Sequence, residues 1–544
     1  MEPGPQPVDG TQHPRVLEHA ALQAALAREV EQREADDHRE HPLTRDPGES
    51  HDEPQDEQHE PGEVLAHEAE PPHDRVALRR PGAVGEARRG PGDDDRGGEG
   101  EAADRQRDRD ADPPPEAAAL EEAKDGCEVA PPGVRHPLPV TLPRRARAGQ
   151  GPASLSAIDL KIVERIGDVA ADEWDRLVGP GDPFLEHAFL AALEASGSVG
   201  ARAGCVPRLV TARDRGGRLV GAVPLYLKTN SYGEFIFDWS WANAAHRSGI
   251  RYYPKLVAAI PFTPATGQRL PVLDAPGVDA AAVTGALLAG VAEVADAEQA
   301  SSTHFLFCTE AESRLLGGHR YLPRLSMQFH WHNRPERPFE SFDDYLSTFR
   351  SRNRKQVRKE REVAASHGLE LRTATGAELE PRDWKALRGL YRENVARHGG
   401  IAYLRDAFFE IARETLGHRL VATLAYRGAD AVAGTINFEK GPHLYGRYWG
   451  CLADYQMLHF ELCYYRLIER AIERRCTLFE AGAQGEHKLK RGLTPALTHS
   501  AHFIRDPDFG EAVARFIAAE AEEVQQEVRL YDEHSPFRAA NEPP

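Results

Sequence analysis

The first 150 residues contain no Phe, Trp, Tyr or Ile. A segment without large apolar side chains cannot bury enough surface to offset the backbone entropy that is lost on folding. Runs such as Asp93-Asp94-Asp95 and Pro113-Pro114-Pro115 add the bias of low-complexity sequence. We therefore expect residues 1–154 to be a disordered acidic tail. A start assigned upstream of the true one would explain the same composition, and this alternative stays open.

The negative charge of the chain lies in the same segment. Residues 1–150 hold 35 acidic and 19 basic residues, a net charge of −16 out of −19 for the whole chain. The remainder is close to neutral, so its overall charge says nothing about its partners. Six cysteines without a Cys-x-x-Cys pair fit reduced thiols, and no run of about 18 apolar residues or signal peptide is visible. The expected location is the cytoplasm.

Beyond the tail, the apolar periodicity repeats one order of elements twice. In the first copy it predicts helices at 171–178 and from Asp182, strands at 208–212, 218–228, 303–308 and 325–331, and a helix at 280–297. In the second copy it predicts helices at 384–398, 405–416 and 460–474, and strands at 419–426, 431–439, 443–449, 477–481 and 498–504. The sequence thus predicts an α/β fold with mixed sheets and two duplicated lobes, residues 155–335 and 336–538.

A strongly basic segment opens the second lobe. Residues 350–361 contain seven cations, and helical spacing puts Arg350, Arg354, Arg358 and Arg361 on one face. Like charges at this spacing repel, so a ligand with several phosphates is the natural partner, with Arg354 and Arg358 as binding residues. A solvated helix without a ligand is the alternative.

A second concentration of polar residues follows the strand at 477–481. The carboxyl ends of strands in open α/β sheets tend to carry ligand sites, and Gly482 and Gly485 permit a close approach. We expect His487 or Glu486 to remove a proton from an amine, with His487 preferred because its ordinary pKa is near neutral. The predicted substrate-binding residues here are Glu480, Gln484 and Lys488. A surface turn is the alternative.

An aromatic stretch, residues 232–253, mixes large rings with Glu234 and Asp238. Aromatic rings offer contact area and interleaved polar groups fix orientation, which suits a substrate groove. Core packing under a long loop is the alternative. The sequence has no Walker-type loop, no His-Glu-x-x-His and no Gly-x-Ser-x-Gly, which disfavours ATP hydrolysis, metal hydrolysis and serine chemistry, and no metal site is expected.

Several stretches together resemble the bacterial family of peptidoglycan biosynthesis/recognition proteins, a Fem-like branch of the GNAT superfamily of N-acyltransferases. The matching stretches are Asp182-Pro-Phe-Leu-Glu-His-Ala-Phe-Leu190, Tyr232-Gly-Glu-Phe-Ile-Phe-Asp238, Arg251-Tyr-Tyr-Pro-Lys-Leu256, Pro261-Phe-Thr-Pro264, Arg352-Asn-Arg-Lys-Gln-Val-Arg-Lys-Glu-Arg361, Leu458-His-Phe-Glu-Leu-Cys-Tyr-Tyr465 and Glu480-Ala-Gly-Ala-Gln-Gly-Glu-His-Lys488. They cover most of residues 158–538 and none of the tail.

The resemblance implies two GNAT-like lobes and transfer of an acyl or aminoacyl group to an amine. It also implies a catalytic role for Lys490, in binding phosphate or stabilising the charge that develops on the ester carbonyl. Leu489-Lys490-Arg491-Gly492-Leu493 is similar to a Phe-Lys-x-Gly-Phe element of Fem relatives, with both Phe residues replaced. The glycine-rich loop typical of acyl-CoA users is missing, which argues against acyl-CoA as the donor. The expected donor is either aminoacyl-tRNA or a phosphate-bearing thioester such as acyl-CoA, and no bound cofactor is expected. A non-catalytic module that recognises a cell-wall precursor or tRNA is the alternative function.

Overall fold

The computed structural model describes residues 158–538, except 399 and 483–484. The predicted tail, residues 1–154, and Gln484 lie outside the described residues. All described residues belong to one of the two compact units of the chain. We keep the predicted boundary and call residues 158–335 the first lobe and residues 336–538 the second lobe.

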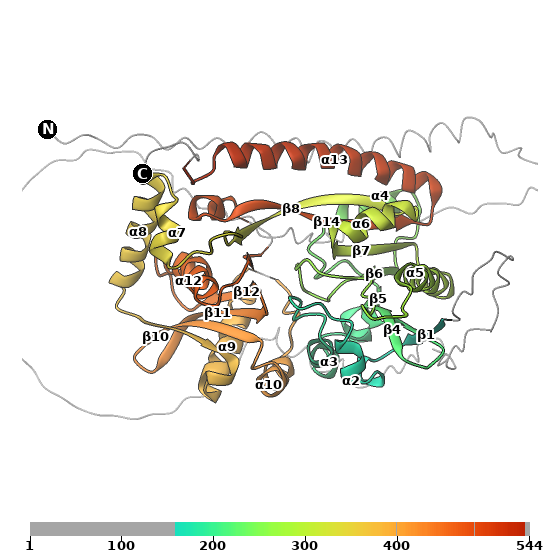
Figure 1. The fold of residues 1–544 in the computed structure, drawn as a ribbon, viewed down its shortest axis with the longest axis horizontal. Coiled ribbons are helices and arrows are strands. Elements are labelled where there is room, and N and C mark those ends of the chain that lie inside the picture. Colours follow the sequence, from blue (N-terminus) through green and yellow to red (C-terminus); the bar gives the residue numbers. More distant parts are fainter. Residues whose placement is uncertain (1–157, 399, 483–484, 539–544) are drawn as a thin grey trace, which may run out of the picture. The chain divides into compact units, whose positions relative to one another are not determined.

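The elements follow one another in nearly the predicted order (Figure 1). The first lobe forms β1 (Asp159–Val163), η2 (Ile166–Asp168), α2 (Ala171–Asp175), α3 (His187–Ala195), η3 (Ala201–Ala203), β2 (Cys205–Pro207), β3 (Leu209–Arg213), β4 (Leu219–Val223), β5 (Leu225–Lys228), α4 (Trp239–Arg247), β6 (Lys255–Ala258), α5 (Ala280–Ala297), β7 (Ser302–Cys308), α6 (Glu310–Gly318) and β8 (Leu322–His332). The second lobe forms α7 (Phe342–Ser347), α8 (Ser351–Ser366), β9 (Glu370–Thr375), η4 (Gly376–Glu378), α9 (Pro381–Arg397), α10 (Asp406–Thr415), β10 (Leu420–Arg427), β11 (Asp430–Lys440), β12 (His443–Cys451), α11 (Leu458–Phe460), η5 (Glu461–Tyr465), α12 (Arg466–Glu473), β13 (Leu478–Glu480), η6 (Glu486–Arg491), β14 (Thr494–Ile504) and α13 (Pro507–Glu533).

The two lobes repeat one topology, as the sequence predicts. Each has antiparallel strands followed by a strand, a helical crossover and a parallel strand. In the first lobe β6 pairs in parallel with β7 after α5, and in the second lobe β12 pairs in parallel with β13 after α12. Neighbouring parallel strands are usually connected by a crossover helix, because a tight turn would make the second strand antiparallel to the first. The result is a mixed α/β fold in two copies.

The lobes exchange their last strands. The large sheet has the order β2-β5-β6-β7-β14-β8-β13-β12-β11-β10-β9. The last strand of the second lobe, β14, therefore pairs with β7 of the first lobe, and β8 of the first lobe pairs with β13 of the second. The long helix α13 lies along β8 and β14 (Figure 1). One continuous hydrogen-bonded sheet thus runs through both lobes.

Several local features differ from the sequence prediction, which also lacks the helices α6, α7 and α13. The predicted strand at 218–228 is divided at Pro224, which cannot donate a ladder hydrogen bond, and β1, β3 and β4 form a separate three-stranded sheet. Helix α3 begins at His187 rather than at Asp182, because the Asp182 carboxylate accepts the N–H groups of Phe184 and Leu185 in a turn. The aromatic stretch contains an unpredicted helix, α4.

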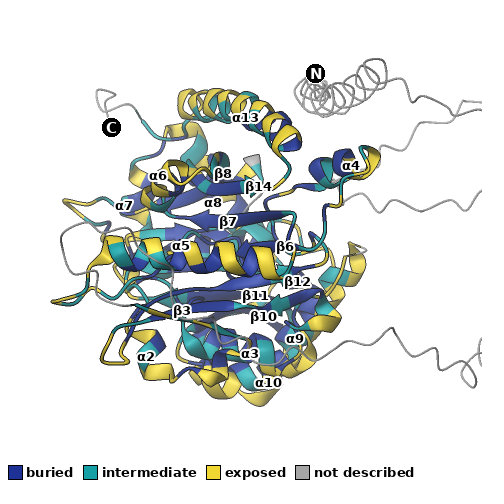
Figure 2. Ribbon diagram, turned by 90° about the vertical axis from the view of Figure 1, so that its right-hand side faces the viewer, coloured by how far each residue is buried: buried dark blue, intermediate teal, exposed yellow. Residues whose placement is uncertain are grey.

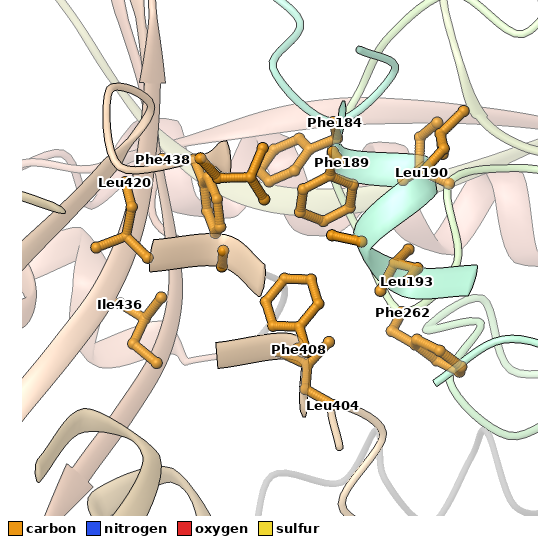
Figure 3. Close-up of a cluster of buried hydrophobic side chains, with 14 of the residues drawn as sticks. Phe184, Phe189, Leu190, Leu193, Phe262, Leu404, Phe408, Leu420, Ile436 and Phe438 are labelled. Atoms are coloured by element: carbon orange, nitrogen blue, oxygen red, sulfur yellow. The ribbon is translucent and has the colours of Figure 1, made fainter. Parts of the chain in front are cut away.

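Aromatic side chains from both lobes share one core (Figure 3). Phe184 and Phe189 of the first lobe lie edge-to-face against Phe438, at ring-centroid distances of 5.3 and 5.5 Å, and Phe189 also meets Phe408 at 6.0 Å. Burial of one such side chain stabilises a fold by about 1.5–3 kcal/mol. This core therefore holds the lobes together independently of the strand exchange.

Helix α5 is the one helix within the described ranges that is long and apolar enough to cross a membrane. Helices of protein cores meet the same criterion, so this is weak evidence. One side of α5 is buried, with Val283, Leu287 and Val291 in the core that contains residues of β3 and β4, and the other side is exposed (Figure 2).

Candidate functional site

The second lobe has a point where two parallel strands separate. Strands β12 and β13 pair only over His443–Tyr445 and Leu478–Glu480. Just beyond, β12 contains a bulge, because Gly446 and Tyr448 face consecutive residues of β11 and leave Arg447 without a counterpart. Bulges are common next to active sites, and ligands of open α/β sheets lie beyond strand ends. The predicted strand-end site therefore gains a defined place in the fold.

Glu480 ends β13 inside the protein. Its residue is only 3% exposed, and one carboxylate oxygen accepts the N–H of Thr266 at 3.3 Å. Burial, with a smaller effect of the Asp182 charge, raises the pKa of Glu480 to about 8, against the opposing charges of Arg269 and Arg447. A carboxyl group with this pKa can exchange a proton near neutral pH.

Lys488 is the second buried ionisable group at this place. It is 3% exposed, and Nζ donates to the carbonyl oxygen of Gly482 at 2.9 Å. No carboxylate pairs with it among residues 158–538 as described, and burial lowers its pKa to about 8. His330, opposite Glu480 in the β8–β13 ladder, is also buried, and burial together with the charges of His332 and Lys488 lowers its pKa to about 3. A carboxyl group, a cation and a neutral imidazole are thus all buried in the region around the end of β13.

The first lobe covers this site with the loop after β6. The Thr266 N–H reaches Glu480, and the Arg447 side chain donates to the carbonyl oxygen of Phe262. Arg269, 1% exposed, donates to the carbonyl oxygens of Ala265 and Leu306, which fixes the loop from below. The candidate site is therefore built from both lobes.

The other predicted residues of the loop lie in or near η6. His487 is exposed, and its Nε2 lies 3.0 Å from the hydroxyl oxygen of Tyr464. Glu486 begins η6, and its side chain and the whole of Gln484 lie outside the description. Lys490 is exposed, two residues from the buried Lys488. The structure thus separates the two lysines that the sequence treats as neighbours in function.

The prediction that four arginines share one free face of α8 is wrong for Arg361. Arg361 does not project to solvent with the others, because it donates to Glu461 at 3.0 Å and to Glu469 at 2.6 Å. Glu360 is buried and accepts both the Arg491 guanidinium, at 2.9 and 3.1 Å, and the Tyr465 hydroxyl. Arg354 is half-buried and Arg358 is 57% exposed, 3.6 Å from Asp343. These bonds join the basic helix to the loop 485–493.

Glu234 and Asp238 lie in the interior of the first lobe. Both are buried around Lys255, whose Nζ donates to Glu234 at 2.8 Å and to Asp238. Burial raises the pKa of Glu234 to about 7. Burial acts in the same direction on Asp238, but the Lys255 charge outweighs it and leaves the pKa of Asp238 below its ordinary value. Trp241 and Tyr252 are core residues, so much of the aromatic stretch packs rather than lines a surface.

Sequence reasoning missed Arg447 and His330. Arg447 stands in the largely apolar strand β12, so an isolated charge within a predicted strand is the signal that could have found it. His330 gave no such signal, because polar residues alternate with apolar ones along β8. Asp182 and Arg269 gave no such signal, because each lies in a loop. Within the described ranges, no group of three or more His, Cys, Asp or Glu side chains could hold a metal ion.

The duplicated topology defines a mixed α/β protein with two similar lobes. The FemAB-like family, described as peptidoglycan biosynthesis/recognition, matches residues 165–539, and the chain belongs to this family. No curated protein matches the chain.

Solved structures with a similar fold have low sequence identity. FemX is 13% identical with a TM-score of 0.40, over 64% of this chain and 98% of FemX. The C-terminal domain of a putative lysylphosphatidylglycerol synthetase from Agrobacterium fabrum is 10% identical with a TM-score of 0.38, over 64% and 95%. A tandem GNAT protein from the clavulanic acid biosynthesis pathway is 12% identical with a TM-score of 0.34, over 64% and 99%.

Proposed function

We propose that this protein is an enzyme that transfers an acyl or aminoacyl group from an activated donor to an amine, at the ends of β12 and β13. Membership of the FemAB-like family supports acyl or aminoacyl transfer in cell-wall metabolism. The observation that carries the proposal is the pair of buried groups Glu480 and Lys488, whose pKa values are both shifted to about 8 beside the β12 bulge.

The two groups have complementary tasks in such a reaction. The ionised Glu480 carboxylate accepts the proton that the attacking amine loses, while the new C–N bond forms and the bond from the acyl carbon to the donor oxygen or sulfur breaks. The Lys488 ammonium stabilises the negative charge that develops on the carbonyl oxygen. His487 and Glu486 remain the alternative bases predicted from the sequence, and Lys490 the alternative cation.

The donor is a phosphate-bearing molecule, either aminoacyl-tRNA or acyl-CoA. Arg352, Lys355 and Lys359 are exposed on α8, and no carboxylate pairs with them within the described ranges. Together with Arg354 and Arg358 they form a cationic surface that suits several phosphates. The Arg491 guanidinium donates a hydrogen bond to Glu360 and so joins α8 to η6. An acyl donor bound on α8 would therefore lie near the loop that contains Lys488. The location is proposed to be the cytoplasm, where these donors occur.

The full chain should be incubated with labelled aminoacyl-tRNA and, separately, labelled acyl-CoA. We expect one donor to be discharged to an amine, and Glu480→Gln and Lys488→Met to slow this at least about a hundredfold. Glu414→Gln and Lys385→Met, both at exposed sites, are the matched controls. If Lys488 acts in the transition state, its variant lowers kcat with little change in KM.

Binding of a donor or precursor without any discharge would favour the alternative, a recognition module. The same variants separate the candidates within the site. Full turnover of both Glu480→Gln and Lys488→Met would move the chemistry to His487, Glu486 and Lys490.

A further inference from the structure

Arg447 is a cation at the candidate site to which the proposed reaction gives no task. It lies in the bulge of β12 and is half-buried. Its guanidinium carbon is 5.2 Å from the ring centroid of Tyr448 and 5.7 Å from that of Phe184. One of its nitrogens donates to the carbonyl oxygen of Phe262, and the side chain also interacts with the Tyr448 hydroxyl. A guanidinium has more N–H donors than these two contacts use.

The charge of Arg447 is not compensated by an ion pair in the described parts of the two lobes. The Glu480 carboxylate acts on Arg447 through its charge, but the two side chains form no ion pair. A guanidinium that is withdrawn from water and has no counter-ion is costly unless a ligand supplies one. Arg447 is therefore a candidate to bind an anionic group of a substrate.

The other charges of the site favour the same kind of ligand. Arg269 and Lys488 are buried cations, and Arg269 is 4.0 Å from the carboxylate of Asp182, while Lys488 bonds to the carbonyl oxygen of Gly482. Burial raises the pKa of both Asp182 and Glu480, which favours their uncharged forms. Three basic groups thus face two carboxyl groups, and in the proposed reaction one of these takes up a proton. A further carboxylate would balance the charge.

The position of Arg447 separates it from the proposed donor surface. That surface, α8, is joined to η6 by the bonds between Arg491 and Glu360. Arg447 instead contacts Phe262 and Phe184 of the first lobe. The donor and Arg447 therefore lie at different borders of the site, so an anionic group at Arg447 belongs to the acceptor.

We propose that Arg447 binds a carboxylate of the acceptor, which makes the acceptor an amine that also carries a carboxylate group. The inference rests on the proposed function, in which Glu480 takes the proton of the attacking amine. A guanidinium forms paired hydrogen bonds with a carboxylate and so fixes its orientation as well as its position. Arg447 selects the acceptor and directs its amine towards Glu480, and it takes no part in bond formation.

The strand ends leave room for such a substrate beside Lys488. A Cβ atom added to Gly482 would meet no described atom closer than 3.9 Å, at the carbonyl oxygen of Gly446 and at Lys488 Nζ. Gly446 directly precedes Arg447 in the bulge. The space next to Gly482 thus lies between the strand that carries Arg447 and the lysine proposed to stabilise the transition state.

The probes for the test are two amines with a carboxylate, γ-aminobutyrate and ε-aminocaproate, which differ in length. Each is compared with its primary amide, which keeps the amine and the chain length but lacks the carboxylate charge. Affinities for the full chain are measured by isothermal titration calorimetry. We expect at least one of the acids to bind at least about tenfold more tightly than its amide.

Arg447→Gln removes the charge and the paired donors. We expect this variant to bind the acid and its amide with affinities within about twofold of each other, because binding of the acid weakens. Arg413→Gln, at an exposed site on α10, is the matched control and should keep the preference for the acid. Arg447→Lys keeps the charge without the paired bonds and should keep only part of the preference. If Arg447→Gln does not fold, the lysine variant and the preference of the parent decide.

Three results would overturn the inference: no binding of either acid, equal affinities of acid and amide in the parent, or an unchanged preference in Arg447→Gln. If Arg447→Gln keeps the preference but loses affinity for CoA or tRNA, Arg447 binds the donor instead. Donor discharge is measured separately. A chain that discharges its donor without preferring the acids keeps the proposed function and loses the carboxylate site. A chain with the preference but no discharge keeps the carboxylate site and loses the proposed function.

Discussion

Glu480 and Lys488 show how burial brings two unlike groups to the same pKa. Removal from water disfavours the charged form of each, so the pKa of the carboxyl group rises to about 8 and the pKa of the ammonium group falls to about 8. Near this pH both groups can gain or lose a proton. The site can therefore carry a proton acceptor and a cation at the same pH, which acyl transfer to an amine requires.

The raised pKa of Glu480 predicts a pH-dependent stability difference. The folded protein holds this proton up to about pH 8, whereas the unfolded chain releases it near 4.5, so the contribution to stability is full below pH 4.5 and is lost as the pH rises to about 8. Glu480→Gln cannot lose a proton. We expect the Tm of the variant, relative to that of the parent, to rise between pH 5 and pH 8, because the free energy of unfolding of the parent decreases by on the order of a few kcal/mol over this range.

Thermal unfolding of parent and variant at several pH values is the measurement. Glu414→Gln, at an exposed site on α10, should give a pH-independent offset. A constant offset for Glu480→Gln as well would show that Glu480 ionises normally in the folded state.

For individual residues, the sequence predicted which polar side chains lie near the site, but it did not predict which of them are buried. The strand end at Glu480 and the loop to Lys490 follow from periodicity, because β13 was predicted from its apolar pattern. Whether Lys488 or Lys490 is buried depends on the path of η6. The sequence cannot decide between them, because the two lysines have nearly the same neighbours along the chain. The hydrogen-bond donor to Glu480, Thr266, and one of the charges that act on it, Arg269, come from the first lobe, and no local pattern predicts a contact over such a separation.

Helix α8 has one buried face and one exposed, basic face. Val357, Glu360 and Ala364 form the buried side, and Arg361 joins Glu461 and Glu469 at its edge. The remaining cations face outward. Helical spacing predicted the helix correctly, but the carboxylates that neutralise Arg361 lie a hundred residues away in sequence and could not be paired with it in advance.

Charge reversal on α8 should weaken donor binding. The double variant Arg354→Glu, Arg358→Glu lowers the net charge of the helix by four. We expect the affinity for the donor to fall at least tenfold at low salt, with a smaller fall at higher salt. Lys385→Glu with Arg413→Glu, on α9 and α10, is the matched control. Fluorescence anisotropy with labelled tRNA and competition with CoA give the affinities. Binding by the parent that hardly varies with salt would argue against a phosphate contact.

Across the whole molecule, the exchanged strands make each lobe depend on the other. Without β14, β7 has an unpaired edge, and without β8, β13 has one. We predict that residues 155–335 and residues 336–544 are insoluble when expressed separately and form a soluble complex when expressed together. Co-purification and a single cooperative unfolding transition are the measurements. A soluble first lobe with its own cooperative transition would contradict this prediction.

Removal of residues 1–154 should have no such effect. The composition of this segment offers no aromatic side chain and few large aliphatic ones that could pack on the lobes. We expect the shortened chain to unfold at the Tm of the full chain. A decrease of several degrees in a thermal scan would show that the segment contributes to the fold.

The strand exchange also has a consequence during synthesis on the ribosome. Strand β7 emerges early, but its partner at one edge, β14, is translated only when residues 494–504 are reached. Until then the nascent first lobe presents an open strand edge, which is the kind of surface that invites wrong pairing and that chaperones shield. A chain interrupted before residue 494 keeps that edge permanently. We therefore expect chaperones to bind a chain truncated before β14 more strongly than the full-length chain.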